Sequence, residues 1–118
     1  MHHPTTIVVL LASSMLVAQA KASDDAITAN FWIDACQDNS PGMMLCRGYL
    51  RGITDMNDMS TFASKQAWWC LPDGVTLDQI RKVILAELAR RPEDHHHPFA
   101  GLATMALRNA FPCKKKER

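Results

Sequence analysis

Four cysteines are the residues in this sequence best suited to chemistry: Cys36, Cys46, Cys70 and Cys113. Cysteines in a chain of 118 residues can bind a metal, act as catalytic thiols or form disulfides. No two of them form a CxxC pair, so neither a zinc knuckle nor a thioredoxin-like redox site is indicated. The redox compartment decides among the remaining uses, because disulfides persist where the environment is oxidising.

A run of histidines, His95 to His97, raises the question of a metal site. Adjacent residues cannot all point at one ion unless the backbone bends to suit them. Apart from the adjoining Glu93 and Asp94, no Cys, Asp or Glu stands nearby at the i+4 spacing that helical metal sites use. We therefore expect the histidines to form a polar start to a helix, and we predict no metal and no other cofactor.

Catalytic residues are equally hard to find. The acidic pair Asp55 and Asp58 has the i, i+3 spacing of one helix face, but nothing around it suggests the pocket that a catalytic acid needs. The sequence contains no GxSxG, no HExxH and no glycine-rich phosphate loop. We expect a solvated pair of carboxylates and a protein that is not an enzyme.

The amino-acid composition excludes several other classes of protein. The net charge is +1 and 47% of the residues are hydrophobic. These values exclude a nucleic-acid-binding protein that works by bulk charge, and they exclude low-complexity disorder. The length fits one domain.

The first twenty residues predict export. Ile7–Ala18 is apolar but too short for a membrane-spanning helix, which needs about 20 residues. Ala18-Gln19-Ala20 follows as a signal-peptidase motif, and Ala22 offers a second cleavage point. An uncleaved anchor helix or a buried helix would be the alternatives. We predict a signal peptide at 1–20, a domain at 21–118 with no membrane contact after cleavage, and hence cysteines paired as disulfides.

The mature chain has the pattern of an all-α domain of four helices. Helical spacing of apolar residues predicts helices over Asp24–Asp34, from Met43 to beyond Phe62, from Leu77 to Pro92, and over Pro98–Ala110. The apolar faces are expected to consist of Ile27, Phe31 and Ala35, with Trp32 as a further candidate, in the first helix; Cys46, Tyr49, Leu50, Ile53 and Met56, with Asn57 as a further candidate, in the second; Leu77, Ile80, Val83, Ile84 and Leu88 in the third; and Phe99, Leu102, Ala103, Ala106, Leu107 and Ala110 in the fourth. The basic residues Arg81, Lys82, Arg90 and Arg91 are expected away from the apolar face of the third helix or at its carboxyl-terminal end. The third begins at a capping box, in which Thr76 is the N-cap and Gln79 stands three residues later. No alternating run of strand type remains, so we predict a small four-helix domain.

This order of helices selects the disulfide pairing. Cys36 ends the first helix and Cys46 lies near the start of the second, so an antiparallel hairpin brings them together. Cys70 precedes the third helix and Cys113 follows the fourth, which returns toward the start of the third. We predict the bridges Cys36–Cys46 and Cys70–Cys113.

Two further features concern helix packing and the binding of a partner. Gly48 and Gly52 form a GxxxG pair, which we expect to pack closely on the first or fourth helix, with an intermolecular contact as the alternative. Trp68 and Trp69 are adjacent, so their side chains point in different directions and both are not expected to be buried. Trp68 is the candidate partner-binding residue. The alternative is that its side chain only packs within the fold.

Three segments together resemble a known family. They are Phe31–Cys36 followed by Cys46–Asp55, then Cys70–Thr76, and finally Pro92 through Phe111-Pro112-Cys113. These segments are similar to the Rap/Tai family of immunity proteins of type VI secretion systems, and they cover nearly the whole mature chain.

The resemblance implies a small helical periplasmic protein, often a homodimer. It implies a protein partner, a peptidoglycan-cleaving amidase effector delivered by a neighbouring cell, whose active site the immunity protein occludes. The alternatives are a periplasmic stress chaperone that exposes apolar surface when its carboxylates are protonated, and a small secreted enzyme. The missing catalytic motifs disfavour the enzyme.

Overall fold

The computed structural model describes residues 27–115, which form an all-α domain. Its helices are α1 (Ala29–Ala35), α2 (Met43–Ser64), α3 (Leu77–Ala89) and α4 (Phe99–Ala110), with a short 3-10 turn, η2 (Pro92–Asp94), between the last two. The predicted four-helix class is therefore confirmed, and the described range contains no strand. The predicted signal peptide and its cleavage points lie outside this range. Among the described helices, none has the length and apolarity needed to cross a membrane.

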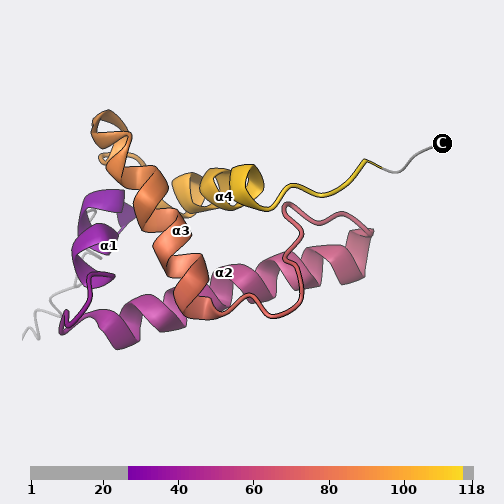
Figure 1. Cartoon of the computed structure of the whole chain (residues 1–118), viewed down its shortest axis with the longest axis horizontal. Helices are drawn as coiled ribbons and strands as arrows, with labels where there is room; N and C mark the ends of the chain where they lie inside the picture. The colour runs from indigo at the N-terminus through magenta and orange to yellow at the C-terminus, as the bar shows by residue number, and fades with distance from the viewer. Residues whose placement is uncertain (1–26, 116–118) are drawn as a thin grey trace, which may run out of the picture.

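The long helix α2 forms the base of the domain, and α3 crosses it at a steep angle (Figure 1). Helix α3 packs on both α2 and α4, and α1 contacts α2 and α4 at one end of the molecule. Helices α2 and α4 hardly contact each other directly. The segment after α2 turns back from its carboxyl end and leads to α3 (Figure 1).

Both predicted disulfides are present. Cys36 and Cys46 join the end of α1 to the start of α2, with Cα atoms 5.3 Å apart. Cys70 and Cys113 join the segment before α3 to the residues after α4, with Cα atoms 4.9 Å apart. The two bridges thus fix both ends of the helical array.

The first helix starts later than the predicted Asp24–Asp34, because Thr28 is extended and precedes α1. Thr28 forms a β-bridge with Pro98, at the start of α4. The backbone N–H of Ala29 then donates to the carbonyl of His97 at 2.9 Å. A distant loop therefore satisfies a first-turn donor of α1 and sets where the helix begins.

The shorter helix also buries a different face. The prediction placed Ile27 and Phe31 on the apolar side, with Trp32 only as a further candidate, but Ile27 and Phe31 are both exposed. Trp32 is buried in their place, and its ring stacks on Tyr49 and Phe99 with centroid distances of 4.1 and 5.8 Å. Aromatic packing on α2 and α4 thus decides the register of α1.

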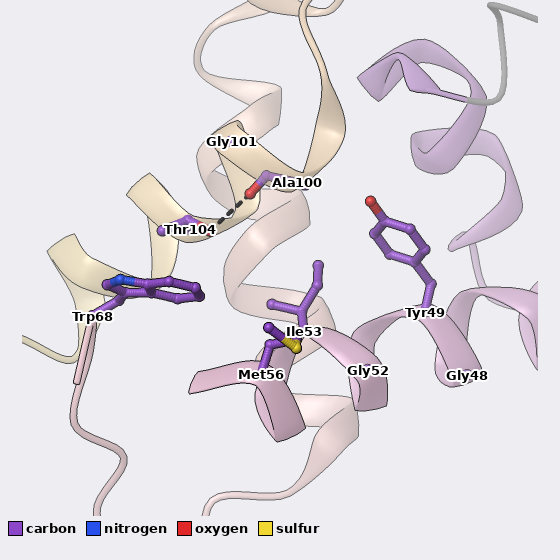
Figure 2. A pocket seen from close by; sticks show the side chains of 9 residues that line it. All are labelled: Gly48, Tyr49, Gly52, Ile53, Met56, Trp68, Ala100, Gly101 and Thr104. Atoms are coloured by element: carbon purple, nitrogen blue, oxygen red, sulfur yellow. Dashed lines mark hydrogen bonds between the residues drawn. The ribbon is translucent and has the colours of Figure 1, made fainter. Parts of the chain in front are cut away.

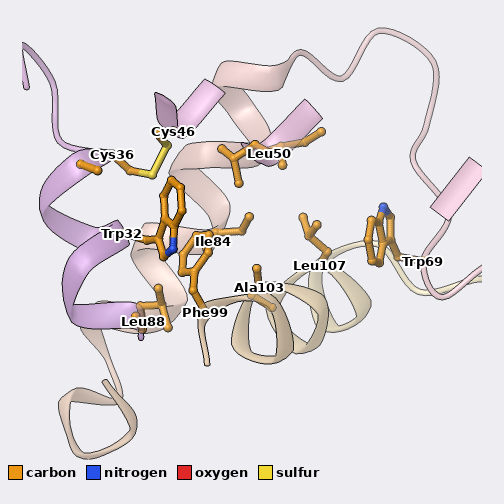
Figure 3. Packing of buried hydrophobic residues seen from close by; sticks show 14 residues of the cluster. Trp32, Cys36, Cys46, Leu50, Trp69, Ile84, Leu88, Phe99, Ala103 and Leu107 are labelled. Atoms are coloured by element: carbon orange, nitrogen blue, oxygen red, sulfur yellow. A yellow bond between two sulfur atoms is a disulfide. The ribbon is translucent and has the colours of Figure 1, made fainter. Parts of the chain in front are cut away.

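The core follows the predicted apolar stripes of α3 and α4 closely. The side chain of Thr76 accepts from the N–H of Gln79 at 3.1 Å, so the predicted cap of α3 is formed. Figure 3 shows side chains from all four helices meeting around Phe99, with Trp69 at the far end of α4. The buried residues of α3 and α4 are Ile80, Ile84, Leu88, Phe99, Ala103, Ala106 and Leu107. Ala110, predicted on the same stripe, is exposed.

Arg81 corrects the prediction that the basic residues of α3 lie away from the core, because it is only 5% exposed. Its Nη1 donates to the carbonyl of Cys36 at 2.7 Å, and its Nη2 donates to Asp38 and to Asp78, each at 2.7 Å. The guanidinium therefore connects the Cys36–Cys46 hairpin to α3 through charge-assisted hydrogen bonds.

We expect Asp78 to contribute stability that depends on pH. Hydrogen bonds from Arg81 and then Lys82 lower the pKa of Asp78 below its usual value of 3.8. A carboxylate whose pKa is lower in the folded state stabilises the fold above its unfolded pKa, and this contribution disappears as the pH falls through the folded value. Asp78→Asn should therefore be less stable than the wild type at pH 7, and the difference should shrink below about pH 4.

Urea denaturation between pH 7 and pH 2 measures this difference. In an Arg81→Met background, the same replacement should show a weaker pH dependence, because the strongest partner of Asp78 is gone. A difference that stays constant over the whole range would contradict the role of the ion pair.

Candidate partner-binding site

An apolar groove lies between α2 and α4, where these helices fail to pack on each other. Its cavity volume is about 730 Å³. Tyr49 and Ile53 point from α2 toward α4, and Trp68 reaches in from the segment after α2 (Figure 2). The lining is Gly48, Tyr49, Gly52, Ile53, Met56, Trp68, Ala100, Gly101 and Thr104. Such a groove offers apolar area and shape to a partner, and little polar chemistry.

The GxxxG pair belongs to this groove, and the expectation of close packing within the chain is wrong. A Cβ atom added to Gly48 or to Gly52 would meet nothing within 4 Å. The reason is geometric, since Gly52 is two residues from the buried Leu50 and so about 200° from it around the helix. Within the described chain, no helix covers that face of α2.

Large apolar side chains extend the exposed surface along α2. Met44, Leu45, Met56, Met59 and Phe62 are between 56% and 79% exposed. Of the positions expected on the buried stripe of α2, Cys46, Leu50 and Asn57 are buried, whereas Met56 is exposed. An exposed apolar area of this extent is typical of a protein-binding surface.

Of the two adjacent tryptophans, one is buried and one is exposed, as expected. Trp69 is fully buried, whereas Trp68 is 46% exposed beside the groove. The backbone of both residues is held by the buried side chain of Asn57. Its Oδ1 accepts from the N–H of Trp68 at 2.8 Å, and its Nδ2 donates to the carbonyl of Trp69 at 3.1 Å.

The next residue adds a second restraint on Trp68. Cys70 is covalently joined to Cys113 and donates its N–H to the carbonyl of Phe111 at 2.9 Å. The loop that carries the exposed indole is therefore fixed in place before any partner arrives.

Sequence reasoning missed the role of Asn57. The helical spacing made Asn57 only a further candidate for the apolar stripe of α2, with no polar role. The available signal was a polar amide among apolar positions, because a buried amide must find partners for its donors and acceptors. Which partners it finds depends on the path of the loop, and the sequence does not give that path.

The other candidate residues lie apart from the groove lining. His95 contacts the carbonyl of Leu88 at 2.7 Å, and the rings of His96 and His97 have centroids 4.0 Å apart. Within residues 27–115, no three His, Cys, Asp or Glu side chains are grouped to hold a metal ion. Asp55 forms an exposed i, i+4 ion pair with Arg51 at 3.0 Å.

Burial raises the pKa of Tyr49, which lies in the groove. The direction of this shift is in keeping with the apolar lining of the groove. The charges of α2 lie outside this lining, on residues such as Arg51 and Asp55. Charged side chains of α2 could therefore contact a partner beside the groove, but they do not line the groove itself.

Comparison with known proteins identifies the chain by its family. A search of curated proteins and a search of solved structures gave no match. The family model of the Rap1a immunity proteins matches residues 28–113, which include all four helices and both disulfides. This match confirms the resemblance seen in the cysteine-containing segments. The chain is therefore a member of the Rap1a immunity protein family.

Proposed function

We propose that this protein is exported to the periplasm and there binds and inhibits a peptidoglycan amidase effector of a type VI secretion system. The family match over residues 28–113 is the observation that carries the proposal. In this proposal residues 1–20 are a signal peptide and residues 21–118 form the mature domain. Two disulfides in so small a domain suit an oxidising compartment.

Inhibition by such a protein requires binding and steric exclusion, and no reaction is proposed for it. An amidase must admit a large polymer to its active site, so a folded domain of this size held over the cleft would block the substrate. The affinity then comes from a few well-packed anchors. A rigid surface is favourable here, because less conformational entropy is lost on binding.

Trp68 is the anchor that we propose for the effector. It is a large, half-exposed aromatic residue, a type enriched among residues that dominate binding energy. Asn57 and the Cys70–Cys113 bridge hold its loop in place, as described above. The groove beside it supplies apolar area with which an effector side chain can pack.

Periplasmic co-expression tests the function. Cells that express a neighbouring amidase effector in the periplasm should lyse, and co-expression of this chain with its first 20 residues should restore growth. A version that starts at residue 21 and stays in the cytoplasm should not protect. Failure to rescue cells from any effector encoded nearby would contradict the proposal.

Binding measurements then test Trp68. Trp68→Ala should weaken the affinity for the effector about 30-fold, which corresponds to about 2 kcal/mol. Isothermal titration calorimetry with the purified effector gives this value. Phe31→Ala is the matched control, since it removes an exposed aromatic side chain on α1 that neither lines the groove nor belongs to the apolar surface of α2. Equal affinities for wild type and Trp68→Ala would exclude Trp68 as an anchor.

A further inference from the structure

The two disulfides differ in how far solvent can reach them. Cys36 is 1% exposed and Cys46 is fully buried, and both belong to the core cluster (Figure 3). Cys70 and Cys113, in contrast, are both exposed. Exchange with an external thiol requires a thiolate to reach a sulfur of the bridge, so access decides which bridge reacts in the folded protein. Of the two bridges, Cys70–Cys113 is the one that meets this requirement.

The charges beside this bridge differ at its two ends. Lys114 and Lys115 directly follow Cys113, and both are exposed. The charged residue nearest to Cys70 along the chain is an acid, Asp73, which is also exposed. Cations beside a sulfur stabilise its thiolate, and a more stable thiolate leaves a disulfide faster. The charges therefore favour Cys113 as the leaving group and Cys70 as the sulfur that is attacked.

The Cys70–Cys113 bridge also attaches the end of the described chain. Helix α4 ends at Ala110, and within the described range no backbone hydrogen bond holds the residues after Phe111. Opening the bridge releases this segment but leaves the Cys36–Cys46 bridge in place. The loop closed by the longer bridge contains α3 and α4, so its opening also removes a constraint on the unfolded chain. The opened protein therefore keeps its helices and loses stability.

We propose that the Cys70–Cys113 bridge is a site of thiol–disulfide exchange with a dithiol protein, and that its state sets the stability of the domain. A thiolate of the partner attacks Sγ of Cys70, the S–S bond breaks, and Cys113 leaves as a thiolate that takes up a proton. The second thiol of the partner then attacks the partner's own sulfur in this mixed disulfide, and Cys70 leaves and is protonated in turn. Two electrons and two protons pass to this chain, and the partner becomes a disulfide. The reverse sequence closes the bridge.

The reducing equivalents must come from a partner. All four cysteines of the chain are in bridges, so this chain has no free thiol that could start the exchange. A dithiol is the partner that fits, because its second thiol completes the reaction without another molecule. The Cys36–Cys46 bridge stays closed throughout, since the core covers it.

Thiol labelling of the purified, oxidised protein tests the proposal without any effector, so its outcome is independent of the proposed function. Folded protein would be incubated with a reduced CxxC protein of the thioredoxin class, alkylated with iodoacetamide and mapped by mass spectrometry. Cys70 and Cys113 should be labelled about 10-fold faster than Cys36 and Cys46, or more. A CxxS version of the probe lacks the second thiol and should stay attached to Cys70. The alkylated protein should unfold cooperatively, at a lower urea concentration than the oxidised protein.

Charge variants supply the control. Lys114→Gln/Lys115→Gln should slow the exchange about 3-fold at low ionic strength, because the leaving thiolate loses its cations. Arg47→Gln/Arg51→Gln removes two exposed charges from α2, which changes the net charge equally, and should leave the rate unchanged.

Equal labelling of the two bridges would mean that both are reduced through unfolding, and this result would overturn the proposal. A Cys70–Cys113 bridge that the probe leaves intact, or an alkylated protein that is unfolded, would overturn it as well. A probe trapped on Cys113, or lysine variants that react at the wild-type rate, would refute the assigned direction of attack.

Discussion

Removing the Cys70–Cys113 bridge should destabilise the protein by about 4 kcal/mol, the cost of closing a loop of this length in the unfolded chain. The two cysteines are 43 residues apart, and their loop contains all of α3 and α4. By the same relation the Cys36–Cys46 bridge, with a separation of 10, contributes about 3 kcal/mol. A domain of this size has about 5–10 kcal/mol of stability in total. The longer bridge is therefore a large part of what holds it folded.

The measurement is urea denaturation of Cys70→Ala, Cys113→Ala and the double variant. Both side chains are exposed, so truncation alone should cost little. Each single variant already opens the bridge, and all three should lose nearly the same stability. This lack of additivity separates loop closure from side-chain packing. If the two single losses add up in the double variant, or if the double variant loses less than about 1 kcal/mol, loop closure is not the source.

The bridges were predictable because topology determines them. Once an α1–α2 hairpin and a returning α4 are accepted, only one pairing joins neighbouring ends. The limits of α3 were predictable for a local reason. Thr76 and Gln79 close a hydrogen bond within one turn, and the proline after α3 ends that helix whatever surrounds it.

The first helix was predicted less well, because its start and its buried face depend on distant residues. The carbonyl of His97 binds the N–H of Ala29, and Tyr49 selects Trp32 over Phe31 for burial. Periodicity in a helix of seven residues is too short to overcome such contacts.

The groove was missed for a related reason. The glycine pattern shows that another backbone can approach α2, but it does not say whether that backbone belongs to the same chain. The answer depends on α3, which lies between α2 and α4 and keeps them apart. Gly48 and Gly52 are left facing outward as a result. The intermolecular alternative for the GxxxG pair thus gains support from the arrangement of three helices that no local motif encodes.

Arg81→Met should cost about 3 kcal/mol, the second largest effect that we expect from a substitution in this protein. The buried carbonyl of Cys36 would lose its donor, and an unsatisfied buried acceptor costs about 1–3 kcal/mol. The charge-assisted bonds from Arg81 to Asp38 and Asp78 would be lost as well. Methionine matches the length of the apolar stem but donates no hydrogen bond, so the replacement isolates the loss of the guanidinium.

Arg90→Met is the control for this experiment, because Arg90 is at the end of the same helix, with a side chain that is 75% exposed and paired with Glu87. An exposed ion pair contributes about 0–1 kcal/mol, so this variant should stay close to the wild type. Thermal and urea unfolding of both variants give the comparison. Equal losses at the two sites would mean that the buried guanidinium has no special role. A large loss at Arg81 alone would show that one arginine holds the disulfide hairpin on α3, a connection that the spacing of charges along the sequence does not reveal.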